Sequence, residues 1–130
     1  MSAAADTLKK VPLFSGLDDG ELENIADGMI ERRFKAGDTL TEQGNPGIGF
    51  FVIEDGAADV TVDGAPRGSI GPGDYFGEIA LLTDSDRTAT LVATTDMLTY
   101  GMTSWDFKPM VEANPELAWK LLSGMAAKLA

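Results

Sequence analysis

The chain has 130 residues with 44% hydrophobic content, which supports one domain with a core of its own but not two. It contains no cysteine and no histidine, so disulfides, metal sites built on these residues, and catalytic pairs of serine or cysteine with histidine are excluded. Ten basic against 21 acidic residues give a net charge of −11, which repels DNA, RNA and anionic lipids, so we expect no direct binding to nucleic acid or membrane.

Nothing in the sequence divides the chain or directs it to a membrane. It has no run of about 18 apolar residues, and its N-terminus lacks a basic start followed by an apolar stretch. Low-complexity tracts and internal repeats are also absent from the sequence. We therefore expect a cytoplasmic protein with a single domain over residues 1–130.

The first part, residues 1–30, has helical character. Asp18 followed by Glu21 is typical of a capping box at a helix start. The apolar residues that follow fall on one helical face: Leu22, Ile25, Ala26 and Met29. The sequence therefore predicts an N-terminal helical part.

The middle part, residues 31–102, has the pattern of short strands. Turn signals recur every few residues, at Gly37-Asp38, Gly44 to Gly47, Asp55-Gly56, Asp63-Gly64 and Gly71 to Gly73. Apolar residues alternate with polar or small ones at Ala58, Val60 and Val62 and again at Leu98, Tyr100 and Met102. Each of these strands should bury one face, which indicates a roll or sandwich with its core between two sheets.

The last part, residues 103–130, returns to a helical pattern. Pro109 is expected to delay or bend the start of a helix that ends near Ala113. Two helix starts are marked by cap residues: Thr103 with Asp106, and Asn114 with Pro115. The last helix carries an apolar stripe of Leu117, Ala118, Leu121, Leu122 and Met125.

The candidate binding residues lie between Gly73 and Ala93. Residues 77–82, as a single helical turn, would aim several free backbone N–H groups at one point, which attracts an anion. Gly77 allows close approach of the main chain, and the donors of the Arg87 guanidinium match phosphate oxygens. Glu78 repels phosphate but suits a hydroxyl donor such as a ribose 2′-OH. A sugar phosphate is implied.

These residues resemble the phosphate-binding cassette of the cyclic-nucleotide-binding domain family. The family pattern is F-G-E-hydrophobic-A-L, a spacer, and then R-small-A-T/S-hydrophobic; residues 76–81 and 87–91 match it without a gap. The similarity covers nearly the whole chain and includes Val11 to Phe14 with Leu17, Phe34, Gly37-Asp38, Gly44, and Phe51 to Ile53 with Gly56.

The resemblance implies a mainly β fold with flanking helices. This fold is a double-stranded β-helix, or jelly-roll-like β-roll, over 31–102, with N-terminal helices over 1–30, a short phosphate-cassette helix, and C-terminal helices over 103–130. The family implies a sensor or regulatory domain for cAMP or cGMP, as in catabolite activator proteins, kinase regulatory subunits and cyclic-nucleotide-gated channels. It implies no enzymatic activity and no cofactor beyond the nucleotide ligand.

The family also implies the roles of individual residues. Its glutamate, here Glu78, contacts the ribose hydroxyl, and its arginine, here Arg87, contacts the cyclic phosphate. We expect the ligand to reposition the last helix, residues 115–130, and a protein partner or effector domain to receive the signal. The sequence does not decide whether the protein forms a homodimer. The implied ligand-binding residues are Phe76, Gly77, Glu78, Ile79, Ala80, Arg87, Thr88, Ala89, Val60, Val62 and Leu91.

Two other functions stay open at the level of sequence. A degenerate family member would use the roll as a protein–protein interaction module without a ligand. Asp86 favours this because a carboxylate beside Arg87 competes with phosphate, whereas intact Glu78, Arg87 and Ala89 favour binding. An enzyme of the cupin type is the third possibility, but its usual metal site needs histidines.

Two side chains bear on the details of recognition. Thr88 is similar to the residue of cGMP-using members, but β-propensity also explains a threonine in a strand, so the preference between cAMP and cGMP stays open. Trp119 lies off the apolar stripe of the last helix and is a candidate to stack on a purine. Packing against the roll or a partner is the alternative for Trp119.

Overall fold

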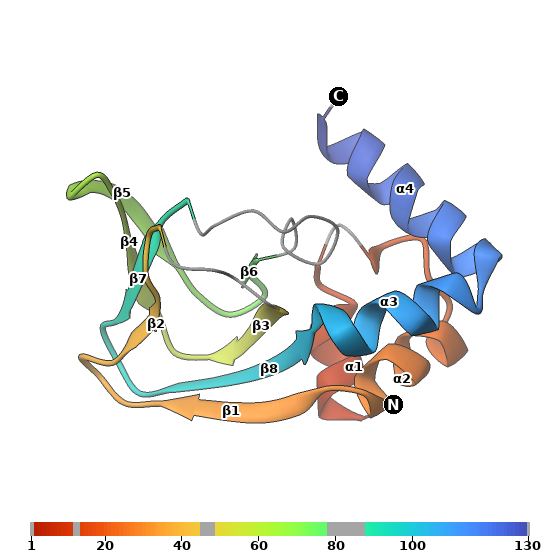
Figure 1. Cartoon of the computed structure of the whole chain (residues 1–130). Helices are drawn as coiled ribbons and strands as arrows, with labels where there is room; N and C mark the ends of the chain where they lie inside the picture. The colour runs from red at the N-terminus through yellow and green to blue at the C-terminus, as the bar shows by residue number, and fades with distance from the viewer. Residues whose placement is uncertain (1, 12–13, 45–48, 78–87, 130) are drawn as a thin grey trace.

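The computed structural model describes residues 2–11, 14–44, 49–77 and 88–129 (Figure 1). Helices lie at both ends of the chain, and strands occupy the region between them. The elements are α1 (Ala3–Leu8), α2 (Asp19–Asp27), β1 (Ile30–Phe34), β2 (Thr39–Thr41), β3 (Gly49–Asp55), β4 (Ala58–Val62), β5 (Ala65–Ile70), β6 (Tyr75–Phe76), β7 (Thr90–Ala93), β8 (Met97–Thr103), α3 (Ser104–Glu112) and α4 (Pro115–Leu129).

The strands of the described residues form two four-stranded antiparallel sheets. The first sheet has the order β1-β8-β3-β6, and the second has the order β2-β7-β4-β5. Apart from the β4–β5 hairpin, each strand lies in the opposite sheet from the strand before it. The chain therefore winds between two layers as a roll, which confirms the predicted mainly β fold with flanking helices.

A small apolar cluster lies between the two sheets. Phe34 of β1 is opposite Met97 of β8, and Ala58 of β4 is opposite Ala93 of β7. Residues opposite each other in an antiparallel pair share a face, so these side chains point into the roll. This inter-sheet cluster consists of Phe34, Ile53, Ala58, Ala93 and Met97, with Leu40 and Ile70 packed against it.

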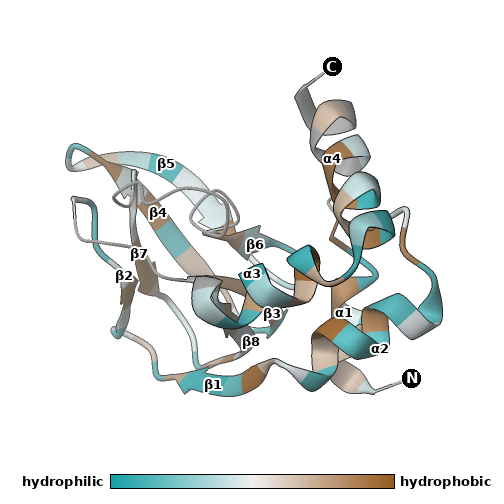
Figure 2. Cartoon of the chain, turned by 45° about the vertical axis from the view of Figure 1, so that its right-hand side comes forward, coloured by the Kyte–Doolittle hydropathy of each residue, from teal (hydrophilic) through white to brown (hydrophobic). Residues whose placement is uncertain are grey.

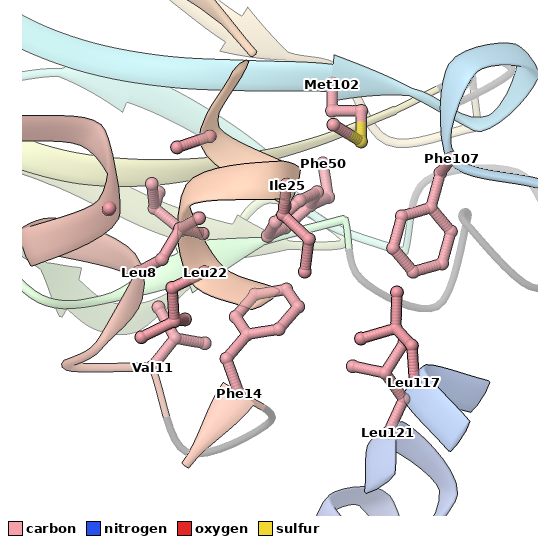
Figure 3. Packing of buried hydrophobic residues seen from close by; sticks show 13 residues of the cluster. Leu8, Val11, Phe14, Leu22, Ile25, Phe50, Met102, Phe107, Leu117 and Leu121 are labelled. Carbon is pink, nitrogen blue, oxygen red and sulfur yellow. The ribbon is translucent and has the colours of Figure 1, made fainter. Parts of the chain in front are cut away.

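A larger apolar cluster lies between the other face of the first sheet and the helices (Figure 3). The sheet contributes Phe50, Val52 and Met102, all buried. The helices and the segment after α1 contribute side chains from both ends of the chain: Ala5, Leu8, Val11, Phe14, Leu22, Ile25, Ala26, Phe107, Leu117 and Leu121. This helix-side cluster joins the N-terminal and C-terminal helices on one surface.

The prediction that the core lies between the sheets was therefore incomplete. β8 is an interior strand of the first sheet, and it is covered on both faces. Met97 and Thr99 are buried toward the second sheet, whereas Tyr100 and Met102 pack against the helix-side cluster. The alternation in the sequence correctly located the strand, but it assigned burial to only one of its two faces.

The predicted helix caps are present. Asp18 and Glu21 form a capping box at the start of α2, and the Thr103 hydroxyl accepts a hydrogen bond from the backbone N–H of Asp106 in α3. The prediction that Pro109 delays α3 was wrong, because the Thr103 cap starts the helix at Ser104 and Pro109 lies inside it.

Only part of the predicted stripe on α4 is buried. Leu117 and Leu121 are 1% and 6% exposed, whereas Leu122 is 59% exposed. The helix contacts the cluster along one edge, so a residue at the margin of the stripe stays in water. Trp119, which lies off the stripe as expected, is 70% exposed. In the parts of the chain that the structure describes, no helix is both long and apolar enough to span a bilayer.

Replacing Leu117 with alanine should destabilise the domain far more than replacing Leu122. Leu117→Ala opens a cavity in the helix-side cluster and should lower the free energy of unfolding by about 2 to 5 kcal/mol. Leu122→Ala removes an exposed side chain and should change it by about 0.5 kcal/mol or less. Urea unfolding of both variants measures the difference, and equal losses would show that α4 packs differently.

A hydrogen bond between β8 and β3 makes the free energy of unfolding vary with pH in the alkaline range. The Tyr100 hydroxyl donates to Glu54 Oε2 at 2.6 Å. This hydrogen bond, with burial and the negative charge of Glu54, raises the pKa of Tyr100 from 10.0 to about 12. The folded state therefore holds this proton more tightly than the unfolded state, whose tyrosine titrates near 10.

The contribution of Tyr100 to stability should be fully present below pH 10 and lost as the pH rises from about 10 to about 12. Tyr100→Phe keeps the ring but lacks the titrating hydroxyl. The free energy of unfolding of this variant should decline less steeply than that of the wild type across this interval. Denaturant titrations at a series of pH values test this, and parallel declines would contradict the assignment.

Candidate functional site

The inner face of the second sheet presents three of the predicted ligand-binding residues. Val60 of β4 lies directly opposite Leu91 of β7, and Val62 follows two residues later on the same face of β4. Leu91 is 4% exposed, whereas Val60 and Val62 are half-buried. The structure therefore brings these residues together as an apolar wall that continues from the inter-sheet cluster.

Phe76 and Gly77 form the approach to the predicted cassette. Phe76 pairs with Phe51 across β6 and β3, and their rings stack with centroids 5.0 Å apart at 21°. Gly77 follows with φ of 85°, a left-handed conformation that side chains with a Cβ rarely adopt. The backbone thus requires a glycine at the point where the motif has one.

Thr88 and Ala89 lead from the cassette into β7. Thr88 is exposed and Ala89 is half-buried. The four remaining predicted residues, Glu78, Ile79, Ala80 and Arg87, lie outside the described residues. Because β6 belongs to the first sheet and β7 to the second, the two ends of the cassette are anchored on opposite layers of the roll.

The structure adds a cation that the sequence analysis did not single out. Arg32 lies two residues before Phe34 in β1, so the two side chains share the face of the strand that points toward the second sheet. Its guanidinium carbon is 5.3 Å from the Phe34 ring and 5.4 Å from the Phe51 ring. The sequence signal for this position was the spacing of two residues between Arg32 and the apolar Phe34 within a strand. The arrangement places a positive charge on the inner face of an acidic protein.

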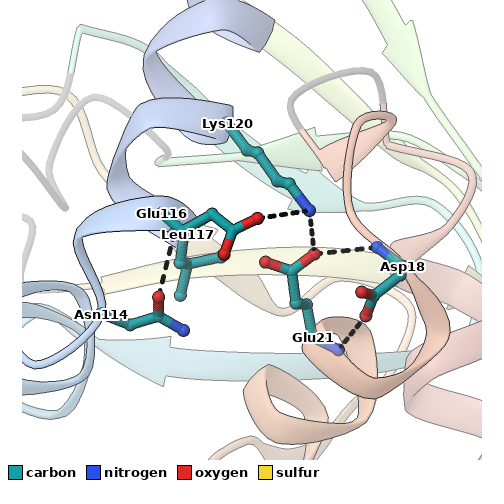
Figure 4. Close-up of polar contacts among 6 residues, drawn as sticks. All are labelled: Asp18, Glu21, Asn114, Glu116, Leu117 and Lys120. Atoms are coloured by element: carbon teal, nitrogen blue, oxygen red, sulfur yellow. Dashed lines mark hydrogen bonds and ion pairs between the residues drawn. The ribbon is translucent and has the colours of Figure 1, made fainter.

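A partly buried ion pair connects α4 to the start of α2 (Figure 4). Lys120 Nζ lies 2.6 Å from Glu21 Oε1, and the two side chains are 28% and 15% exposed. The same oxygen accepts a hydrogen bond from the backbone N–H of Asp18 at 3.1 Å. The hydrogen bond to Glu21 raises the pKa of Lys120. The capping box was predicted, but its contact with α4 was not, because the two residues are 99 positions apart.

The start of α4 carries a further contact at this junction. The side chain of Asn114 accepts a hydrogen bond from the backbone N–H of Leu117 at 3.2 Å, as the predicted N-cap requires. Glu116 lies 3.9 Å from Lys120 on the same helix. The first turns of α4 are thus fixed by a cap, by the pair with Glu21, and by the burial of Leu117 (Figure 4).

Comparison with known families identifies this architecture. The family model of the cyclic nucleotide-binding domain matches residues 31–114. The chain belongs to this family. The match begins in β1 and runs through both sheets to the residue before α4.

Individual relatives agree with this membership. Over 92 residues the chain is 44% identical to a cAMP-dependent protein kinase regulatory subunit of Aspergillus niger. The aligned region covers 69% of this chain and 22% of that protein. The chain thus spans less than a quarter of the length of this curated relative. The relative supports a regulatory, cyclic-nucleotide-binding domain and does not favour a roll that serves only for protein contact.

Solved structures support the fold. The N-terminal domain of a transcriptional regulator from Streptomyces coelicolor A3(2) superposes with a TM-score of 0.88 at 30% identity, covering 95% of this chain and 90% of that one. The regulatory domain of Toxoplasma gondii PKA, in co-crystal structure with cAMP, has a TM-score of 0.74 at 27% identity, covering 82% and 42%. The β-roll with flanking helices is therefore the fold of this chain.

Proposed function

We propose that this domain binds cAMP or cGMP at residues 76–89 and regulates a protein partner without catalysing a reaction. The observation that carries the proposal is the unbroken motif from Phe76 to Ala89 in a family member whose Gly77 has the required left-handed backbone. The fungal relative is named for cAMP, and the Toxoplasma gondii structure contains it. These two names make cAMP the first ligand to test.

Each proposed contact has a chemical reason. Arg87 carries a guanidinium whose paired donors match the cyclic phosphate, and Glu78 accepts the ribose hydroxyl. Free N–H groups from Gly77 to Ala80 add to the phosphate contact, with Phe76, Ile79, Thr88 and Ala89 completing the cassette. Val60, Val62 and Leu91 supply the apolar wall for the sugar and base.

The charge of the chain requires the recognition of phosphate to be local. A net charge of −11 repels an anionic nucleotide at long range, but this repulsion is screened beyond about 8 to 10 Å at physiological salt. Short contacts inside the roll are screened less. Arg87 would supply the direct contact, and Arg32 adds a second positive charge on the inner face of the first sheet.

The signal would leave the domain through α4. Among the described residues, its contacts with the rest of the chain include the burial of Leu117 and Leu121 and the pair between Lys120 and Glu21. A ligand can shift α4 if it contacts one position of this helix better than another. Exposed Trp119 is available to a base or to a partner. The named relatives differ in their outputs, so we propose a protein effector, with a kinase as the class that the fungal relative suggests.

Removing the Arg87 guanidinium should weaken nucleotide binding strongly. Arg87→Ala should weaken cAMP binding by about 2 to 4 kcal/mol, because it removes a charge-assisted contact with phosphate. Arg87→Lys should restore only part of it, since one ammonium cannot form the paired contact. Isothermal titration calorimetry with cAMP and cGMP measures both effects.

Arg67→Ala is the matched control, because it removes an exposed arginine of β5 and changes the net charge equally. It should bind like the wild type. Equal affinities of the wild type and Arg87→Ala would contradict the assignment of the phosphate contact. A wild type that binds neither nucleotide would contradict the proposed function.

Thr88 tests the choice between the two nucleotides. If its hydroxyl contacts the exocyclic amine of guanine, Thr88→Ala should weaken cGMP binding by about 0.5 to 1.5 kcal/mol and leave cAMP binding nearly unchanged. Thr88→Ser keeps the hydroxyl and should preserve the wild-type ratio of the two dissociation constants. A ratio that is the same in all three proteins would reduce Thr88 to a strand-forming residue.

A further inference from the structure

Three strand ends meet where the chain leaves the cassette. β2 pairs with β7 up to Thr41 opposite Leu91, and β4 pairs with β7 up to Thr61 opposite Thr90. Figure 1 shows these three strands side by side in the second sheet. Both ladders therefore stop at the first residues of β7, directly after Arg87 to Ala89.

Gln43 bridges these strand ends beyond the ladders. Its backbone N–H donates to the Thr90 hydroxyl at 2.9 Å. Its side-chain Nε2 donates to Asp63 Oδ1 at 2.8 Å, and its Oε1 accepts from the backbone N–H of Asp63 at 2.7 Å. One residue thus connects the start of β7 to the tip of the β4–β5 hairpin.

Asp63 is a well-defined anchor for this bridge. Asp63 and Gly64 have φ of 54° and 77°, as in the tight two-residue turns that join antiparallel strands. Because the turn fixes the Asp63 backbone, the N–H group that donates to Gln43 has a fixed position, and the Asp63 side chain accepts the second hydrogen bond. Val62, a residue of the apolar wall, directly precedes this anchor.

We infer that Gln43 is a positioning residue for nucleotide binding, an inference that rests on the proposed function. It does not belong to the cassette. Its bonds instead extend the β4–β7 pairing beyond the last ladder residues, and tie the start of β7, three residues after Arg87, to the tip of the hairpin that carries Val60 and Val62. The phosphate contact and the apolar wall must both reach one small ligand, so the bridge holds them at matching positions before the ligand arrives.

The bridge has two halves in series, and this predicts a distinctive pattern in variants. Gln43→Met keeps the length of the side chain but removes both bonds to Asp63. Thr90→Val keeps the β-branched shape but removes the acceptor on β7. Because either change breaks the connection that Gln43 makes between the hairpin tip and the start of β7, each should weaken cAMP binding about three- to tenfold. The double variant should bind no more than about twofold more weakly than whichever single variant has the lower affinity.

Thr90→Ser is the matched control, because it retains the hydroxyl that accepts from Gln43. It should bind within about twofold of the wild type. All four variants are neutral, so the net charge that the ligand meets is unchanged. Denaturant unfolding of each protein shows whether it is fully folded under the conditions of the binding measurement.

Amide hydrogen exchange tests the bridge without any nucleotide. In Gln43→Met the Asp63 amide has lost its acceptor and should exchange faster than in the wild type. In Thr90→Val the Gln43 amide has lost its acceptor and should also exchange faster. Unchanged exchange of both amides would overturn the bridge itself.

The binding data separate the positioning role from the proposed function. If the wild type binds cAMP and the single variants bind equally well, or if the losses of the two single variants multiply in the double variant, the positioning role is overturned and the proposed function stands. If the wild type binds neither cAMP nor cGMP, the proposed function fails, and the positioning role for these ligands fails with it.

Discussion

The two interior strands of the first sheet are covered on both faces, and the rest of the structure depends on this constraint. β3 and β8 lie in its interior and place Phe50, Val52 and Met102 against the helices while Ile53 and Met97 face the second sheet. Both apolar clusters thus take side chains from opposite faces of the same two strands. A displacement of these strands would therefore change the packing both between the two sheets and beneath the helices.

This arrangement connects the candidate site to the C-terminal helix through few layers. Phe76 at the approach to the cassette stacks on Phe51 of β3, and the next residue of β3, Val52, faces the helix-side cluster that contains Leu117 of α4. Packed interiors resist gradual deformation, so a shift at one face tends to move the strand as a unit. A contact path from the approach to the cassette to α4 thus runs through the described residues.

Local patterns in the sequence predicted the features that depend on neighbouring residues. The caps at Asp18, Thr103 and Asn114 involve hydrogen bonds across three positions, and the glycine of the cassette motif has the backbone conformation that only glycine adopts easily. The roll itself followed from the spacing of turns and from the family resemblance. The family resemblance implied the binding role of Val60, Val62 and Leu91, and alternation along the strand placed Val60 and Val62 on one face.

Features that depend on distant residues could not be predicted in this way. The exposure of Leu122 depends on the angle at which α4 meets the cluster, and the position of Pro109 inside α3 depends on an upstream cap. Gln43 looked like an ordinary loop residue before Gly44, because its partners lie 20 and 47 positions further along the chain. The segment 78–87, which holds Glu78 and Arg87, lies outside the described residues, so the roles of these two residues remain predictions.

The capping box of α2 gives α4 a docking point that forms without α4. Glu21 and Asp18 exchange hydrogen bonds over three residues of chain, and one oxygen of Glu21 also contacts Lys120. Such a local motif persists when a distant partner leaves, so the carboxylate stays oriented and α2 keeps its cap. Departure of α4 would then cost the domain an ion pair and part of one cluster, but no helix would have to unfold, and the returning helix would find its acceptor already in place.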